Sequence, residues 1–106
     1  MNWVALTDYS QIQKALENSE PFLVFKHSTR CSISSMAKSR FERSYNLEGV
    51  VAFYLDLIAY RSISGQLATD FNVQHQSPQL LFIQDGICTY NTSHNSISID
   101  AIKELL

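Results

Sequence analysis

A cysteine stands where an apolar, strand-like run passes into a helix-like segment. Four consecutive apolar residues, Phe22 to Phe25, precede a short polar turn that leads to Cys31. Apolar residues recur at helical spacing after it, so we expect the thiol at the N-terminus of a helix. The unpaired N–H groups and the dipole of a helix N-terminus favour an anion, and a thiolate is stabilised there relative to a thiol. The spacing therefore predicts a nucleophilic sulfur.

Positive charge gathers in sequence around this cysteine. The segment from Lys26 to Arg43 holds five cations and one acid, a net charge of +4, although the whole chain carries −2. Cations beside a thiol lower its pKa and attract acidic partners. A solvated helix face explains the three cations that follow the cysteine at least as well. We therefore assign a role near the thiol only to its direct neighbour, Arg30.

The pattern indicates a single working thiol. Ser34 occupies the place of the second cysteine in a Cys-x-x-Cys motif, so no neighbouring thiol can resolve a disulfide on Cys31. The Ser34 hydroxyl could donate to the Cys31 sulfur, but an ordinary first-turn helix serine fits the pattern about as well. Cys88 lies in a later apolar strand with no cation nearby, and we interpret it as core filler, with a resolving role as the minority alternative.

Length and composition limit the classes of protein. The 106 residues suffice for one domain with a single core, residues 1–106. Apolar runs are far shorter than a membrane span, and a net charge of −2 gives no general affinity for nucleic acid or membranes. The first residues lack the pattern of a secretory signal, so we expect a cytoplasmic protein. No zinc-ligand spacing or phosphate-binding loop is present, so we expect no metal and no bound cofactor.

Apolar periodicity divides the chain into alternating strands and helices. Thr7 or Asp8 is the expected cap of the first helix, and Ser62 that of the third. The buried stripe of the second helix is predicted to hold Ile33, Met36, Ala37 and Phe41. The expected strands are 3–6, 22–25, 50–55, 79–84 and 87–90, and the expected helices are 8–18, the segment after Cys31, 62–71 and 99–106.

The order β-α-β-α-β-α-β-β-α is that of the thioredoxin fold, an α/β fold with a central mixed sheet and helices on both faces. The turn signal Asp85-Gly86 predicts a hairpin between the last two strands. If the strand after Pro78 is antiparallel to the strand before Cys31, its start lies beside the cysteine. Its hairpin partner then ends at the same edge, which brings residues 92–96 there too.

Three motifs together resemble the YtxJ-like monothiol bacilliredoxins of the bacillithiol system, within the thioredoxin superfamily. The motifs are Lys-His-Ser-Thr-Arg-Cys-Ser-Ile-Ser at 26–34, Val-Gln-His-Gln-Ser-Pro-Gln at 73–79, and Ser-His at 93–94. The family usually reads Thr-Cys-Pro-Ile-Ser, whereas here Arg30 separates Thr29 from Cys31 and Ser32 replaces the proline.

The resemblance implies that Cys31 takes a low-molecular-weight thiol, bacillithiol as co-substrate, from S-thiolated client proteins. Thr29, Arg30, Ser32 and Ser34 are then the neighbours of the thiol. Pro78 is expected to be cis and to face the cysteine, with the Ser77 backbone pairing with a client chain. Ser93 and His94 are candidates to meet a carboxylate of the ligand, although a loop histidine without a role fits His94 about equally well.

Other interpretations stay open beside this one. The cysteine would also suit a monothiol glutaredoxin-like iron–sulfur carrier, although the Cys-Gly-Phe-Ser motif of that class is missing, or a thioredoxin-fold adaptor without catalysis. For His27, a surface or boundary position is slightly favoured over a hydrogen bond near the thiol. His75 is assigned no role.

Overall fold

The computed structural model describes residues 2–28, 32–45, 47, 49–93, 97, 102 and 104–105. These residues form a mixed sheet of five strands in the order β1-β3-β2-β4-β5. Strands β1, β3 and β2 are parallel, whereas β4 is antiparallel to β2 and to β5. The elements in chain order are β1 (Trp3–Ala5), α1 (Ser10–Glu17), β2 (Phe22–His27), α2 (Ser32–Ser44), β3 (Val51–Asp56), α3 (Arg61–Asp70), β4 (Gln79–Gln84) and β5 (Ile87–Ser93).

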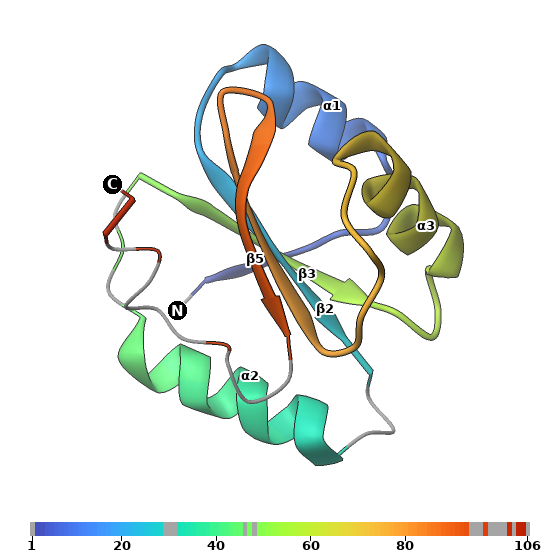
Figure 1. The fold of residues 1–106 in the computed structure, drawn as a ribbon, viewed down its shortest axis with the longest axis vertical. Helices are drawn as coiled ribbons and strands as arrows, with labels where there is room; N and C mark the ends of the chain where they lie inside the picture. Colours follow the sequence, from blue (N-terminus) through green and yellow to red (C-terminus); the bar gives the residue numbers. More distant parts are fainter. Residues whose placement is uncertain are drawn as a thin grey trace.

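Helices cover both faces of the sheet, with α2 on one face and α1 and α3 on the other (Figure 1). Alternate residues of β2 pack against the helices on the two opposite faces of the sheet. Phe22 and Val24 belong to the apolar cluster that includes Ile12 of α1 and Leu67 of α3. Leu23 and Phe25 belong to the opposite cluster, with Ala37 and Phe41 of α2. The predicted central strand is therefore apolar on consecutive positions because both of its sides are buried, and the predicted thioredoxin-like fold is confirmed.

The last two strands form the predicted hairpin. Asp85 and Gly86 both have positive φ, 52° and 77°, which is the backbone of a two-residue turn whose twist suits a hairpin. Strand β5 continues to Ser93, three residues beyond its expected end at Tyr90. That extension carries the strand back to the edge of the sheet at which β2 ends.

The helix starts differ from the predicted caps. The N-cap of α1 is Tyr9, and Asp8 accepts a hydrogen bond from the Ser10 N–H at 2.8 Å from the preceding turn. Helix α3 starts at Arg61, so Ser62 lies within its first turn and is not the cap. The cause is the turn after β3, where the N–H of Tyr60 donates to the carbonyl of Asp56 at 3.0 Å and starts the helix early.

The buried face of α2 is also shifted from the predicted stripe. Ala37 and Phe41 are buried as expected, but the side chain of Met36 is 69% exposed. Ser34 is fully buried and continues the stripe toward the N-terminus at i, i+3 and i+7. The apolar pattern misplaced this face because its first buried residue is a serine, and a search for apolar periodicity does not include polar residues.

Most of the predicted helix 99–106 lies outside the described residues. Ile97 and Ile102 are buried in the cluster beneath α2. Leu105, an apolar residue within the range of that predicted helix, has a side chain that is 39% exposed. The chain thus returns to the α2 layer after β5.

Candidate functional site

Four strands present an end at one edge of the sheet. Lys26 of β2 pairs with Gln79 of β4, and Gln79 pairs with Ser93 of β5. Strand β3 ends there as well, since the N–H of Leu57 donates to the carbonyl of His27 at 2.8 Å. The predicted convergence of the β4 start and the β5 end on the end of β2 is confirmed.

The proline that precedes β4 has the conformation implied by the resemblance. The Ser77–Pro78 peptide bond is cis. Pro78 is buried and Ser77 is half-buried. Because β4 runs antiparallel to β2 from Gln79, both residues lie at the sheet edge from which the chain leaves β2.

Four of the candidate site residues, Thr29, Arg30, Cys31 and His94, lie outside the described residues. The described residues on either side set their place in the chain. Strand β2 ends at His27, and α2 begins at Ser32, the residue directly after the cysteine in sequence. Ser32 is exposed. The predicted order of a strand before the cysteine and a helix after it is therefore confirmed.

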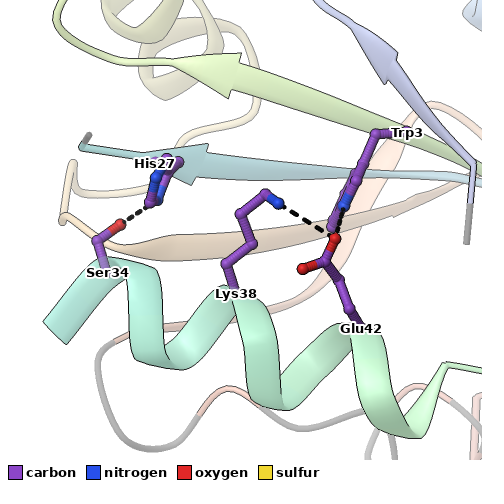
Figure 2. A network of polar contacts seen from close by, with 5 residues as sticks. All are labelled: Trp3, His27, Ser34, Lys38 and Glu42. Atoms are coloured by element: carbon purple, nitrogen blue, oxygen red, sulfur yellow. Dashed lines mark hydrogen bonds and ion pairs between the residues drawn. The ribbon is translucent and has the colours of Figure 1, made fainter. Parts of the chain in front are cut away.

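A buried hydroxyl ties the start of α2 to the end of β2. The Ser34 Oγ lies 2.6 Å from the Nδ1 of His27 (Figure 2). It also accepts a hydrogen bond from the Ser28 N–H at 3.1 Å. Ser28 precedes the undescribed segment and Ser34 follows it, so this contact brackets the segment that holds the cysteine. The Ser34 side chain thus links helix and strand, a role that neither sequence alternative foresaw.

His27 is buried, whereas the sequence slightly favoured a surface or boundary position. Its ring is 6% exposed, and it faces α2 because it shares the parity of Leu23 and Phe25 along β2. Burial lowers the pKa of His27, and the nearby ammonium of Lys38 lowers it further. The Ser34 hydroxyl has one donor and two lone pairs, so it can bond to Nδ1 of the neutral ring and still accept from the Ser28 N–H.

The cations of α2 are partly neutralised within their own helix. Lys38 donates to Glu42 at 3.1 Å, and the same carboxylate accepts the indole N–H of Trp3 at 2.8 Å (Figure 2). The Lys38 ammonium also lies 5.7 Å from the ring centroid of Trp3. These contacts support the interpretation of this part of the charge cluster as a structural helix face.

Lys26 was counted in the positive field around the thiol, but it lies elsewhere. Its side chain is fully buried on the α3 side of the sheet. The ammonium donates to the carbonyl of Ser64 at 3.3 Å and lies 3.4 Å from the Nδ1 of His75. Burial lowers the pKa of Lys26 to about 8. Within the described part of the chain, no carboxylate forms an ion pair with it.

His75, which was assigned no role, is an exposed residue that contacts the buried Lys26 and the hydroxyl of Ser64. Its Nδ1 lies 3.1 Å from the Ser64 hydroxyl as well as near the Lys26 ammonium. An ammonium has donors only, so the Nδ1 beside it is an acceptor and the ring proton is on Nε2. Burial and the Lys26 charge lower the pKa of His75.

A cleft of about 370 Å³ opens beside this cluster at the same edge of the sheet. It lies between the end of β2, the loop after β3, the first turns of α3 and the loop before Pro78. Arg61 and His75 bring positive or proton-donating groups to it, and neither was selected from the sequence. The lining residues are Ser28, Leu57, Ile58, Arg61, Ser64, Gly65, His75 and Ser77.

The described residues were compared with the requirements of a metal site and of a membrane-spanning helix. No group of three or more His, Cys, Asp or Glu side chains among them is placed to hold a metal ion. None of the helices they form combines the length and apolar character needed to cross a membrane.

Solved structures define the class of fold. The chain is similar to a candidate oxidoreductase with a thioredoxin fold, at 27% identity and a TM-score of 0.81 over 96% of this chain and 91% of that one. It is also similar to Trxlp from Edwardsiella tarda EIB202, at 14% identity and a TM-score of 0.73 over 99% and 98% of the two chains. A mutant thioredoxin from Halobacterium salinarum NRC-1 matches at 15% identity and a TM-score of 0.70, over 98% and 87%. The protein is thus a thioredoxin-like α/β domain.

The family model for the monothiol bacilliredoxin BrxC matches residues 4–102. The chain belongs to this family, and thiol–disulfide exchange of the bacilliredoxin type is the chemistry that membership implies.

Proposed function

We propose that this protein removes bacillithiol, or a similar low-molecular-weight thiol, from mixed disulfides on client proteins, with Cys31 as the nucleophile. The observation that carries the proposal is the convergence of the Cys31-bearing connection, Ser77-Pro78 and the end of β5 on one sheet edge, in a chain of the monothiol bacilliredoxin family. The serine at position 34 supports a single-thiol reaction.

The proposed reaction is one exchange followed by regeneration. The Cys31 thiolate attacks the sulfur of the small thiol in the mixed disulfide, so a bond forms between these two sulfurs and the client leaves as a thiolate that takes a proton from water. A second molecule of the small thiol then attacks the capped Cys31. It releases the Cys31 thiolate and carries the first molecule away as a symmetrical disulfide.

Cys88 is proposed to take no part in this cycle. It pairs with Ile83, and Ile83 pairs with Phe22 at the start of β2, so it lies toward the opposite end of the sheet from the end of β2. Its S–H donates to the carbonyl of Tyr90 at 3.3 Å, and burial raises the pKa of its thiol. A raised pKa lowers the thiolate fraction on which attack depends.

The proposal is tested by intact-mass spectrometry of a bacillithiolated client incubated with the protein. We expect the mass of the client to fall by the adduct and that of the protein to rise by the same amount. Cys31→Ser should abolish both changes, and Cys88→Ser should leave them at the wild-type rate. Undiminished release by Cys31→Ser would overturn the proposal.

A further inference from the structure

We propose that the cleft beside the end of β2 binds the carboxylate end of an acidic low-molecular-weight thiol, with Arg61 as the specificity-determining residue. This inference rests on the proposed function, because the cleft gives it a substrate class, a small thiol with an anionic tail. Three features support it: the lining of the cleft, the buried charge beneath it and the short separation in sequence between its lining and the cysteine.

The lining of the cleft suits an anion. Its polar members are three serines, the guanidinium of Arg61 and the His75 ring. None of the described lining residues is acidic. Asp56, at the end of β3, directs its Oδ1 to the N–H of Ile58 at 3.0 Å and is not part of the lining. A carboxylate in the cleft would meet charge-assisted donors without a competing acid.

A cation without a countercharge underlies the same cleft. The buried ammonium of Lys26 reaches Ser64 and His75, both of which line the cleft. Its side chain is fully buried, and no carboxylate among the described residues pairs with it. Buried charges in proteins are usually paired. A bound anion would supply the missing countercharge, and the Lys26 contact also keeps the proton of His75 on Nε2, the ring nitrogen left free to donate.

The position of Arg61 is unfavourable for the helix that holds it. Arg61 is the first residue of α3, whose first turn contains no acid. A cation near a helix N-terminus opposes the macrodipole. An exposed cation therefore occupies a costly position at the rim of the cleft, as expected if it is kept for a ligand.

The size and place of the cleft match a small molecule that must also reach the thiol. About 370 Å³ lies in the range of small-ligand sites. Ser28 lines the cleft and precedes Cys31 by three residues in the sequence. Three residues of fully extended chain span about 11 Å at most, so the Cα atoms of Ser28 and Cys31 are no further apart than that. The proposal places the tail of the thiol in the cleft and its sulfur at the cysteine, within that span.

Two matched mixed disulfides of one client test this site. One carries N-succinylcysteamine, which has a carboxylate, and the other carries N-acetylcysteamine, which has none. We expect wild-type protein to release the succinyl thiol about two- to fivefold faster, as one exposed guanidinium–carboxylate pair allows. Arg61→Gln should bring the ratio of the two rates close to one. Arg43→Gln, which removes an exposed cation of α2 outside the cleft, should keep the wild-type ratio.

A second measurement does not depend on sulfur chemistry. Titration of Cys31→Ser with N-succinyl-S-methylcysteamine should shift the backbone amide signals of Ser28, Arg61 and Ser77, and the N-acetyl analogue should not. Gly65→Leu should weaken these shifts, because a Cβ at Gly65 enters open space beside the cleft.

The outcomes separate the two proposals. Equal release of both thiols by the wild type, or a preference that survives Arg61→Gln, would overturn the carboxylate site and leave the exchange reaction standing. Release of neither thiol, together with the predicted amide shifts, would overturn the exchange reaction and support the binding site.

Discussion

Replacement of Lys26 by methionine should stabilise the protein at neutral pH. Burial lowers the pKa of Lys26 from 10.5 to about 8. Each pKa unit corresponds to about 1.4 kcal/mol, so keeping this ammonium in the folded state costs about 3 kcal/mol at pH 7. Methionine has a similar unbranched shape and carries no charge. After allowing for the lost hydrogen bond, we expect Lys26→Met to raise the free energy of unfolding by about 1–3 kcal/mol.

The substitution leaves no buried group without a partner. The Ser64 carbonyl lies within α3, where the helix itself supplies an N–H donor. His75 keeps the Ser64 hydroxyl, 3.1 Å from its Nδ1, and its ring is exposed to water. The penalty that usually follows the removal of one member of a buried polar pair therefore does not apply.

The assay is urea unfolding at pH 7 and at pH 10. A pKa that is lower in the folded state means that the unfolded chain binds more protons between about pH 8 and pH 10.5, so this group raises the stability as the pH rises through that window. His75 and Cys88 interact electrostatically with Lys26. The difference between wild type and Lys26→Met therefore reports the lysine together with its coupling to these two groups, and it should shrink at pH 10.

The control for this substitution is an exposed lysine. Lys14 lies on the outer side of α1, and Lys14→Met should change the free energy of unfolding by less than about 0.5 kcal/mol at either pH. A loss of stability in Lys26→Met at pH 7, or a difference from wild type that does not depend on pH, would refute the reasoning that an unpaired buried charge lies beneath the cleft.

Three further predictions concern the α2 side of the sheet. Ser34→Ala removes two buried hydrogen bonds and should lower the free energy of unfolding in urea by about 2–3 kcal/mol, whereas Ser39→Ala on the exposed face should change it by less than about 0.5 kcal/mol. Phe41→Ala should lower the free energy of unfolding by about 3–5 kcal/mol. An equal loss in Met36→Ala would contradict the observed burial of Phe41 and exposure of Met36 on α2. Because the pKa of His27 is lowered in the folded protein, the unfolded chain takes up a proton first as the pH falls below about 6.5, and the free energy of unfolding should decline there. His27→Gln should flatten that decline in urea titrations between about pH 7 and pH 5.

The fold could be predicted from the sequence because its signals are local and repeated. Consecutive apolar residues in β2 and β4 marked strands buried on both sides, and Asp85-Gly86 marked the hairpin. The strand order followed from rules of connection and from the resemblance. That order also predicted that Ser77-Pro78 and Ser93 lie at the sheet edge where β2 ends. This part of the candidate site could therefore be predicted from the sequence.

The polar residues of β2 could not be assigned in the same way. A lysine or a histidine at the end of a strand most often reaches solvent, and composition alone places Lys26 among the surface cations. Its burial depends on Ser64 of α3 and on His75 of the loop before Pro78, which are 38 and 49 residues away in sequence. One signal was present: Lys26 follows four apolar residues of a strand expected to be covered on both sides.

The alternation of a strand explains how one sheet edge carries two different sets of contacts. Neighbouring residues of β2 point to opposite faces, so His27 meets Ser34 of α2 and Lys26 meets Ser64 of α3. On the α2 face, the contact fixes the chain on both sides of the segment that holds the cysteine. On the α3 face, the buried charge lies under a cleft that the same segment adjoins through Ser28. We therefore expect the proposed sulfur chemistry and the proposed recognition of a small thiol to respond separately to substitution, because substitutions on one face leave the contacts of the other in place.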